Sequence, residues 1–411
     1  MTDLAPPVPI KLLLGAAFSS DVRVMLVKHL LSGIKNGRFS LTLPGGQRIT
    51  HEGPEAGPEA ELTVHRWRVL RRLMVEGDVG FADAYIAGDW DTPDLAALLK
   101  FWVTNMQVAE NFFAGSFFSR LGRLFKHGKN KNSRAGSRRN ILAHYDLGNE
   151  FYKLWLDEKM IYSSAVYDKA EETLEQAQAN KFDRVTRMLG LHGKESVLEI
   201  GCGWGGLAAH LAGHGAKDVT GVTISPSQLA IAQASMKQQG LAEQVDLRLQ
   251  DYRDIKGKFE RIVSIEMFEA VGEAYWATYF QTASRLLKAG GNAVLQVITI
   301  ADERFEAYRR NPDFIQTHVF PGGMLPSKTK LKEVAEQCGL KLSGDECFGL
   351  SYARTLAEWR NRFLAAWPRI APLGYSEEFK RLWLYYLSYC EAGFAAGLID
   401  VGLYKFEPDQ A

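Results

Sequence analysis

The sequence predicts an α/β fold whose larger unit is a doubly wound parallel sheet, preceded by a smaller α+β unit. The first observation is length, because 411 residues are too many for one ordinary hydrophobic core. The second is a regular alternation of short apolar segments with helical segments after residue 140, which is typical of repeated β-α units. We expect strands at 197–200, 219–222, 245–249, 261–265 and 293–298, with helices such as 227–239 and 275–287 between them.

The N-terminal unit, about residues 21–104, carries strand, turn and helix signals in quick succession. No catalytic cluster is visible in it, so we expect the chemistry in the rest of the chain. The expected elements are a strand at 39–43, a turn at 44–46, a return strand at 48–50, a loop at 53–58 marked by two Gly-Pro pairs, a strand at 62–64 and a helix at 67–74.

A strongly basic stretch lies between the two units, although the net charge of the chain is only +1. No acidic residue occurs between Glu110 and Asp146, and aromatic pairs at 112–113 and 117–118 precede the cations. Two interpretations stay open: a solvated linker whose aromatic neighbours pack on the first domain, or an interfacial segment that binds anionic lipid. The cations include Arg123, Lys126, Lys129, Lys131, Arg134, Arg138 and Arg139.

Neither a signal peptide nor a membrane span is expected. The apolar run at 12–14 is too short for a signal segment, and no run reaches the roughly 18 apolar residues that a span needs. The four cysteines lack the spacing of a metal site or of a disulfide framework. We therefore expect a cytoplasmic protein, at most peripheral on the inner membrane leaflet, with no bound metal and no nucleic-acid partner.

The most informative segment is 197–205, an apolar strand that runs into glycines at alternate positions and then into a helix. Glycines allow a sharp turn and close approach of a ligand, and the helix N-terminus offers unpaired N–H groups. The spacing G-x-G-x-G does not match the dinucleotide fingerprint G-x-G-x-x-G. Glu199, two residues before Gly201, instead points to the acid-then-glycines loop of S-adenosylmethionine (SAM) methyltransferases; the alternative is a tight turn without a ligand.

The next two strands also end in polar side chains that suit a nucleoside. Thr223 and Gln228 follow the second strand, where Ser225 or Ser227 caps the next helix, and Asp251 and Tyr252 follow the third. Because ligands bind outside the carboxyl ends of parallel strands, these groups are expected to converge on one site. SAM carries a sulfonium cation, so Trp204, Tyr162 and Tyr252 are candidates for cation–π contact.

Seven segments in a fixed order resemble the cyclopropane-fatty-acyl-phospholipid synthase family: 144–152, 160–165, 197–205, 221–228, 267–272, 320–327 and 363–368. The likeness covers about residues 140–406. It implies a seven-stranded Rossmann-like methyltransferase domain at 141–411, a lipid-associated α+β domain at 1–120 and a basic linker at 121–140. The cofactor contacts that we then expect are Tyr162, Ser163, Glu199, Gly201, Gly203, Trp204, Gly205, Thr223, Gln228, Asp251 and Tyr252.

The resemblance further implies methylene transfer from SAM to the cis double bond of an unsaturated acyl chain in a membrane phospholipid. In the family a bound bicarbonate serves as the base, which here implies a site formed by Glu269, Tyr352, Ile298 and Ser164. Gln296 stands where the family has a histidine, and a glutamine cannot carry a proton as imidazole does. Bicarbonate therefore stays open, with His144 and His318 as alternative bases.

Several outcomes remain open at this point. The carbocation formed by methyl transfer can lose a proton to close a ring, or rearrange by hydride shift to a methylene- or methyl-branched chain. A methyltransferase of the same fold acting on a soluble small molecule is a second hypothesis, and a lipid-binding protein without activity a third. The expected partners are an anionic phospholipid surface and the acyl substrate, and a homodimer is left open.

Overall fold

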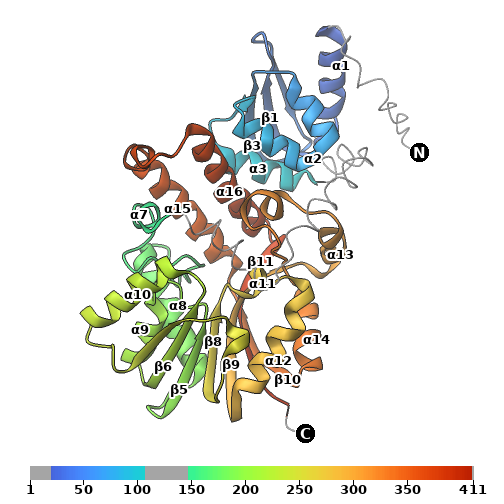
Figure 1. Cartoon of the computed structure of the whole chain (residues 1–411). Helices are drawn as coiled ribbons and strands as arrows, with labels where there is room; N and C mark the ends of the chain where they lie inside the picture. Colours follow the sequence, from blue (N-terminus) through green and yellow to red (C-terminus); the bar gives the residue numbers. More distant parts are fainter. Residues whose placement is uncertain (1–19, 107–146, 410–411) are drawn as a thin grey trace. The chain divides into compact units, whose positions relative to one another are not determined.

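The structure is a computed structural model that describes residues 20–106 and 147–409 (Figure 1). Contacts divide the chain into unit 1, residues 1–123 with 377–392, and unit 2, residues 124–376 with 393–411. The basic stretch, the aromatic pairs before it, His144 and the expected domain boundaries at 120 and 140 lie outside the described residues. Their predicted roles therefore stay predictions.

Unit 1 is built on a four-stranded sheet in the order β2-β1-β3-β4. The predicted hairpin is present, because β1 and β2 pair antiparallel from Arg38–Glu52 to Thr42–Arg48. Phe39, Leu62 and Trp90 are buried and provide much of the core. The elements are α1 (Ser20–Leu31), β1 (Asn36–Thr42), β2 (Arg48–Glu52), β3 (Glu55–Val64), α2 (Arg68–Ile86), β4 (Trp90–Asp91) and α3 (Leu95–Thr104).

The expected loop at 53–58 is wrong in its second half, because β3 begins at Glu55. The register of β1 against β3 shifts between Asn36 and Arg38, and Gly37 has a φ of +79°. A Cβ on Gly57 would lie 2.7 Å from the backbone nitrogen of Gly37. The glycines therefore allow a bulged, close approach of two strands where the sequence pattern indicates a break.

Residues 377–392 of α16 (Glu377–Ala395) pack within unit 1, although the sequence grouped them with the C-terminal domain. The guanidinium of Arg381 donates to the carbonyl oxygens of Tyr85 and Trp90 at 2.5 and 2.8 Å and lies 4.0 Å from the Tyr85 ring centroid. It also pairs with Asp91 at 2.7 Å. These contacts join a late segment of the chain to the first sheet.

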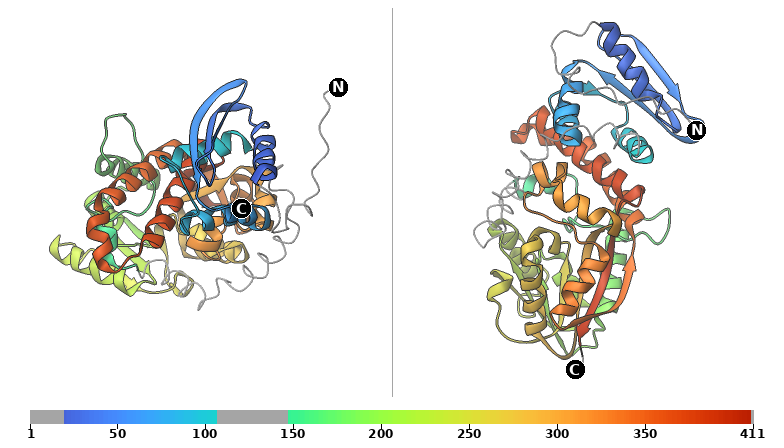
Figure 2. Two further views of the ribbon diagram at one scale, coloured as in Figure 1. Left: turned by 90° about the horizontal axis from the view of Figure 1, so that it is seen from above. Right: turned by 90° about the vertical axis from the view of Figure 1, so that its right-hand side faces the viewer.

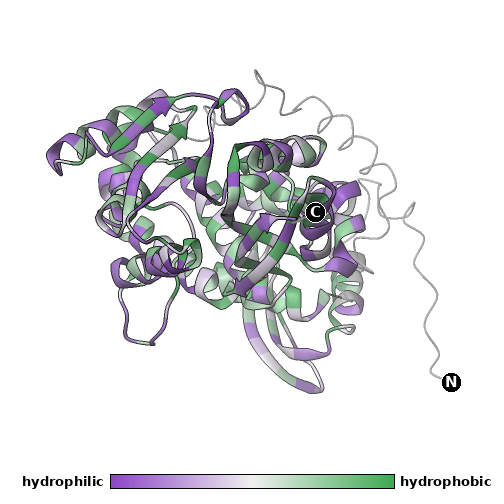
Figure 3. Cartoon of the chain, turned by 90° about the horizontal axis from the view of Figure 1, so that it is seen from below, coloured by the Kyte–Doolittle hydropathy of each residue, from purple (hydrophilic) through white to green (hydrophobic). Residues whose placement is uncertain are grey.

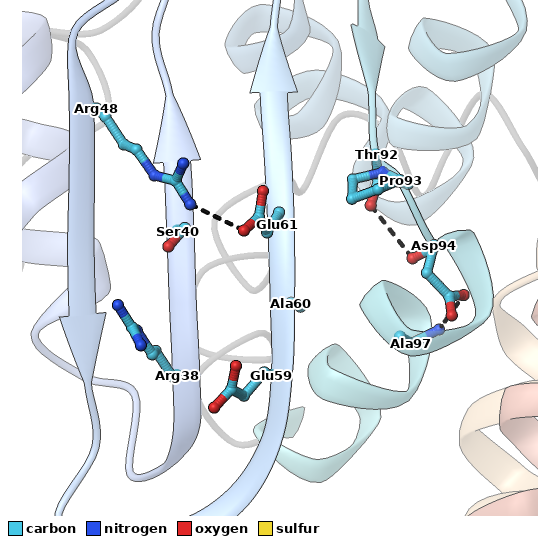
Figure 4. A pocket seen from close by; sticks show the side chains of 10 residues that line it. All are labelled: Arg38, Ser40, Arg48, Glu59, Ala60, Glu61, Thr92, Pro93, Asp94 and Ala97. Carbon is cyan, nitrogen blue, oxygen red and sulfur yellow. Dashed lines mark hydrogen bonds and ion pairs between the residues drawn. The ribbon is translucent and has the colours of Figure 1, made fainter.

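A polar pocket lies on the sheet side of unit 1 (Figure 4). Arg48 pairs with Glu61 at 2.8 Å, and the carboxylate of Asp94 accepts from the backbone N–H of Ala97 at 2.9 Å, which caps α3. These polar groups satisfy one another, and no catalytic pattern emerges. The lining residues are Arg38, Ser40, Arg48, Glu59, Ala60, Glu61, Thr92, Pro93, Asp94 and Ala97.

Unit 2 contains a seven-stranded sheet in the order β10-β11-β9-β8-β5-β6-β7, with helices on both sides (Figures 1 and 2). Strands β9, β8, β5, β6 and β7 run parallel, and β11 is antiparallel to both of its neighbours. The predicted doubly wound α/β fold is therefore confirmed. The strands are β5 (Glu195–Ile200), β6 (Ala216–Thr223), β7 (Val245–Leu249), β8 (Phe259–Ile265), β9 (Leu287–Ile300), β10 (Leu340–Cys347) and β11 (Ile399–Pro408).

The helices of unit 2 begin and end at the expected kinds of residue. A capping box of Thr173 and Gln176 starts α8, and Gly190 in the left-handed region ends it. Ser225 caps α10, with Pro226 in its first turn. The helices are α7 (Asn149–Lys153), α8 (Leu174–Leu189), α9 (Gly206–Gly213), α10 (Pro226–Gln238), α11 (Phe268–Val271), α12 (Trp276–Leu286), α13 (Asp302–Arg310), α14 (Lys328–Gln337) and α15 (Gly349–Ile370).

The core of unit 2 is continuous beneath the carboxyl ends of the strands. Leu198, Ile262 and Leu295, from three adjacent strands, are at most 1 % exposed. Hydrophobic and hydrophilic residues alternate along many of the helices (Figure 3). Phe268 of α11 stacks on Trp276 of α12 with ring centroids 5.5 Å apart. This packing holds the segment after β8 rigidly. Within the described ranges, no helix is long and apolar enough to cross a membrane.

Candidate active site

The glycine turn joins β5 to α9 and has the backbone that only glycine adopts without strain. Gly201, Gly203 and Gly205 have φ values of +88°, +51° and +85°. A Cβ on Gly201 would lie 3.1 Å from Cγ of Met267, whereas the same position on Gly203 meets open space. The turn is therefore accessible at its centre and lies directly against the segment that follows β8.

Glu199 lies at the end of β5, where the turn begins, and is 3 % exposed. Burial raises the pKa of its carboxyl to about 8, opposed by a backbone hydrogen bond from Ala208 and by the charge of Lys181. Among the described residues its Oε2 has no hydrogen-bond donor. A buried acceptor without a donor fits a ligand hydroxyl or ammonium group, such as those of SAM.

The polar groups after β6 and β7 lie where the sequence predicts, but some of them form hydrogen bonds with neighbouring side chains. Thr223 Oγ1 donates to Gln228 Oε1 at 3.1 Å, and both side chains are buried. The carboxylate of Asp251 accepts from the Arg253 guanidinium at 2.8 and 2.6 Å. Asp251 is thus oriented by Arg253 and keeps further lone pairs, so its predicted contact with a nucleoside stays a prediction, and Tyr252 lies 5.4 Å from the ring of Tyr279.

Tyr162, one of the three aromatic residues predicted for cation–π contact, lies among other rings that were not predicted. Its ring lies 5.4 Å from that of Tyr152, 5.8 Å from Trp155 and 5.3 Å from Trp359. The Trp204 ring lies 5.3 Å from Tyr152, and its Nε1 donates to Oδ1 of Asn149 at 2.8 Å. These rings form an apolar, electron-rich cluster beside the glycine turn, which suits a sulfonium cation and a lipid chain.

Ser163 is buried, and its hydroxyl accepts a hydrogen bond from Lys181. The ammonium of Lys181 on α8 donates to Ser163 Oγ at 2.6 Å, and Gln178 Nε2 donates to the carbonyl of Ser163 at 3.0 Å. Lys181 is fully buried, and desolvation lowers the pKa of its ammonium to about 8 while Glu266, Asp157 and Glu199 oppose that shift. No local pattern around Lys181 predicts that its ammonium is buried.

The groups expected to hold bicarbonate converge on the carboxylate of Glu266. Glu266 Oε1 accepts from the backbone N–H of Ser164 at 2.8 Å and from Nε2 of Gln296 at 2.6 Å. Glu266 Oε2 accepts from the hydroxyl of Tyr352 at 2.7 Å. The structure therefore brings Ser164, Gln296 and Tyr352 together as predicted, but around a side chain that the sequence analysis did not select.

Glu266 follows the last residue of β8, which is where functional groups of a parallel sheet are expected. The resemblance instead implies Glu269, three residues later in the chain. Glu266 is partly buried and has a φ of +47°. Burial raises the pKa of its carboxyl, while the bonds from Tyr352 and Ser164 and the charge of Lys181 oppose that shift.

Glu269 lies in α11, near Glu266, and accepts from a different donor than Glu266 does. Its Oε1 accepts from the backbone N–H of Ile298 at 2.5 Å, and in the described part of the chain its Oε2 has no partner. Burial, together with the nearby charge of Glu266, raises the pKa of its carboxyl to about 8. Glu269 therefore carries a proton at neutral pH and is a potential donor.

His318, one of the alternative bases, is a packed side chain. Its ring stacks on that of Phe314, with ring centroids 5.1 Å apart.

Among the described residues, Asp183, His210 and His214 bring potential metal-ligand atoms within 4.8 Å of one another. Asp183 and His210 already pair at 3.3 Å, and Asp183 is exposed, so the cluster does not by itself indicate a metal ion.

Comparison with known proteins decides what this arrangement belongs to. The family model described as mycolic acid cyclopropane synthetase matches residues 132–404. The chain belongs to this family. It is 37% identical over 357 residues to tuberculostearic acid methyltransferase UfaA1 of Mycobacterium tuberculosis, covering 84% of this chain and 83% of the relative. It is also 37% identical over 344 residues to the cyclopropane-fatty-acyl-phospholipid synthase of Escherichia coli K12, covering 82% and 85%.

Solved structures of the mycolic acid cyclopropane synthetase family agree with the fold. Mycolic acid cyclopropane synthase CmaA1, complexed with SAH and CTAB, aligns with a TM-score of 0.61 and 30% identity over 66% of this chain and 97% of that one. Cyclopropane synthase MmaA2 of Mycobacterium tuberculosis aligns with the same TM-score at 29% identity, over 66% and 97%. The protein is thus a SAM-dependent methyltransferase of this family, and the predicted family, fold and cofactor SAM are confirmed.

Proposed function

We propose that the enzyme transfers the methyl group of SAM to the cis double bond of an unsaturated acyl chain in a membrane phospholipid and closes a cyclopropane ring. One observation carries the proposal. The glycine turn meets the segment after β8, because Met267 lies against Gly201 while Glu266 and Glu269 flank Met267. The predicted methyl-donor end and the buried acids are therefore neighbours in one site.

When bound, SAM supplies an activated methyl to the alkene, whose π electron pair forms the new C–C bond as the S–C pair leaves with sulfur. The resulting carbocation must be shielded from water and must lose a proton from the transferred methyl. The rings of Tyr162, Trp155 and Trp359 supply apolar, π-rich surface for the chain and the cation. The buried acidic side chains provide an acceptor for the proton that the transferred methyl group loses.

A second candidate keeps the same first step and yields a methylene- or methyl-branched chain. It is supported by the similarity to UfaA1, named a tuberculostearic acid methyltransferase, and by Gln296 in place of the family's histidine. In that route a hydride moves to the cationic carbon before the proton is lost. The two products have different carbon skeletons but the same mass until the branched alkene is reduced.

The test is incubation of the full chain with SAM and phospholipid vesicles whose acyl chains are monounsaturated. Modified chains should gain the mass of one CH₂, and NMR of the lipid should show cyclopropane methylene protons rather than exocyclic alkene protons. Turnover of soluble small molecules without vesicles would favour the small-molecule hypothesis instead. SAM binding with unchanged lipids for every chain type would contradict the proposal.

We further propose that the basic stretch at 123–139 brings the enzyme to the anionic inner leaflet, in the cytoplasm. Support comes from its cations and from the absence of acids between Glu110 and Asp146. Association with anionic vesicles should weaken as salt rises, because exposed charges are screened within about 10 Å at 0.1 M ionic strength. Binding that is equal at low and high salt would remove this electrostatic role.

A further inference from the structure

The carboxylate of Glu266 accepts hydrogen bonds from three of the groups that were expected near bicarbonate. The backbone N–H of Ser164 and the amide of Gln296 donate to one oxygen, and the hydroxyl of Tyr352 donates to the other. A carboxylate and a bicarbonate present the same pair of oxygen atoms at the same spacing. The single N–H of Ser164 and the single O–H of Tyr352 can each serve one of the two groups but not both at once, and the Gln296 amide also donates to the carbonyl oxygen of Ser164 at 3.4 Å.

The remaining groups do not rescue a bicarbonate site. The backbone N–H of Ile298 donates to Glu269 Oε1, so the protonated carboxyl of Glu269 is the donor that remains of this set. A bound bicarbonate would add a second negative charge beside the carboxylate of Glu266, whose charge already raises the pKa of the Glu269 carboxyl. The residues of this chain therefore do not fit a bound bicarbonate.

The backbone at Glu266 is held in an unfavourable conformation. Within the described ranges, Met160 and Glu266 are the non-glycine residues with positive φ, at +54° and +47°. A side chain in this region costs energy that a glycine would avoid, so it persists where surrounding contacts impose it. Here the conformation places a carboxylate on three donors at the end of a strand, which points to a use for that carboxylate.

Burial raises the pKa of the Glu266 carboxyl, and the groups around the carboxylate oppose that shift. Lys181 on α8 is the buried cation that interacts with it, and the three donors favour the anion. Glu269 on α11 has no cation among the groups that act on it, and burial together with the charge of Glu266 raises the pKa of its carboxyl. One neutral acid beside one anionic carboxylate is the arrangement expected where two acids share a site.

We propose that Glu266 is the general base of this enzyme and stands in place of bicarbonate. The inference rests on the proposed function. In the step, a C–H bond of the transferred methyl breaks, its electron pair forms the bond to the cationic carbon, and the proton goes to Glu266 Oε2. That oxygen accepts one hydrogen bond, from Tyr352, and keeps a free lone pair. The proton passes to water after the product leaves.

The same assignment holds for the branched product. There the electron pair of the broken C–H bond forms a C=C double bond after the hydride shift, and the proton again goes to Glu266. The base is therefore independent of which product forms. An enzyme that uses bicarbonate must bind its base from solution. In this chain the base is a side chain and is always present.

The test compares the wild type with Glu266→Gln, Glu266→Gly and a surface control, Glu333→Gln. Glu333 lies on α14 and pairs with Lys330 at 2.7 Å in solvent. Turnover is measured with SAM and monounsaturated phospholipid vesicles in carbonate-free buffer and again with added bicarbonate. Folding and SAM affinity of each variant are checked by thermal melting and calorimetry.

We expect the wild type and Glu333→Gln to turn over equally well with and without bicarbonate. Glu266→Gln should lose about 100-fold or more in turnover, as expected for a lost general base, with SAM affinity kept. Glu266→Gly frees the three donors and relieves the backbone, so added bicarbonate should restore part of its activity. A merely structural role for Glu266 would not give this rescue.

Wild-type activity that disappears in carbonate-free buffer and returns with bicarbonate would overturn the inference, as would an active Glu266→Gln enzyme. Occupancy is measured separately by ¹³C NMR of labelled bicarbonate, which should bind to Glu266→Gly and not to the wild type. Binding to the wild type would also overturn the inference. If no lipid is modified by the wild type, the proposed function fails, and the NMR measurement still decides what Ser164, Gln296 and Tyr352 hold.

Discussion

The hydroxyl of Tyr352 donates to Oε2 of Glu266 at 2.7 Å, across 86 positions of sequence. Tyr352 lies near the start of α15 and Glu266 at the end of β8, so the bond fixes the carboxylate relative to two elements of unit 2. The Tyr352 ring also lies 4.4 Å from that of Phe394. The ring is therefore held by packing, and its hydroxyl can be removed without a cavity.

Tyr352→Phe should lower turnover while SAM affinity stays the same. Hydrogen bonds to charged groups contribute about 1.5–3 kcal/mol, which corresponds to roughly a 10- to 100-fold loss if the bond acts at the reacting carbon. Steady-state kinetics and calorimetry measure the two quantities. A loss of SAM affinity equal to the loss in turnover would instead place Tyr352 at the cofactor.

Lys181→Met should destabilise the fold strongly at neutral pH. The substitution removes the buried cation that interacts with Glu266, Asp157 and Glu199, and breaking a buried pair costs about 3–5 kcal/mol. The loss should shrink at pH 5, because the pKa values of these carboxyls are raised and they take up protons. Urea unfolding at both pH values measures this; equal losses would mean that the charge of Lys181 is unimportant.

Gly201→Ala should weaken SAM binding by at least about tenfold. The φ of +88° costs an alanine roughly 1–2 kcal/mol, and its Cβ would lie 3.1 Å from Met267. Gly257→Ala is the matched control, because Gly257 has a φ of +102° with nothing within 4 Å of a Cβ. Calorimetry should show normal SAM affinity for the control. Equal affinities of the two variants would mean that the Gly201 turn does not contact SAM.

Glu199→Gln should flatten the dependence of stability on pH in the absence of SAM. The folded pKa of about 8 lies above the ordinary 4.5, so between these values the folded state holds a proton that the unfolded state lacks. Stability therefore falls as pH rises through this window, by up to about 1.4 kcal/mol per unit for this group. Urea unfolding from pH 5 to 8 should show a smaller slope for the variant, and an unchanged slope would contradict the shift.

Much of the parallel sheet follows from local sequence. The strands expected at 197–200, 219–222, 245–249, 261–265 and 293–298 all lie within β5, β6, β7, β8 and β9. Their apolar runs and glycine or serine boundaries are short-range signals, and the cofactor turn is one of them. The pairing of β10 with β11 was not expected, because it joins residues more than 50 positions apart, such as Cys347 and Gly402.

The arrangement of the active site depends on contacts between distant segments, which local sequence patterns do not predict. Ser164, Gln296 and Tyr352 were selected because the resemblance names their positions, but which anion they hold depends on tertiary contacts across 102, 30 and 86 positions. Lys181 is an ordinary helical lysine in sequence, and only the packing of α8 makes it a buried cation. Glu266 has a local signal in its place directly after β8, whereas Glu269 was implied by the family resemblance.

The most direct test of the account is a crystal structure of the full chain with S-adenosylhomocysteine, grown in bicarbonate. We predict that the Glu266 carboxylate accepts hydrogen bonds from Ser164, Gln296 and Tyr352, with S-adenosylhomocysteine seated on the Gly201 turn. A bicarbonate bound to those three donors, with Glu266 turned away from them, would contradict the account.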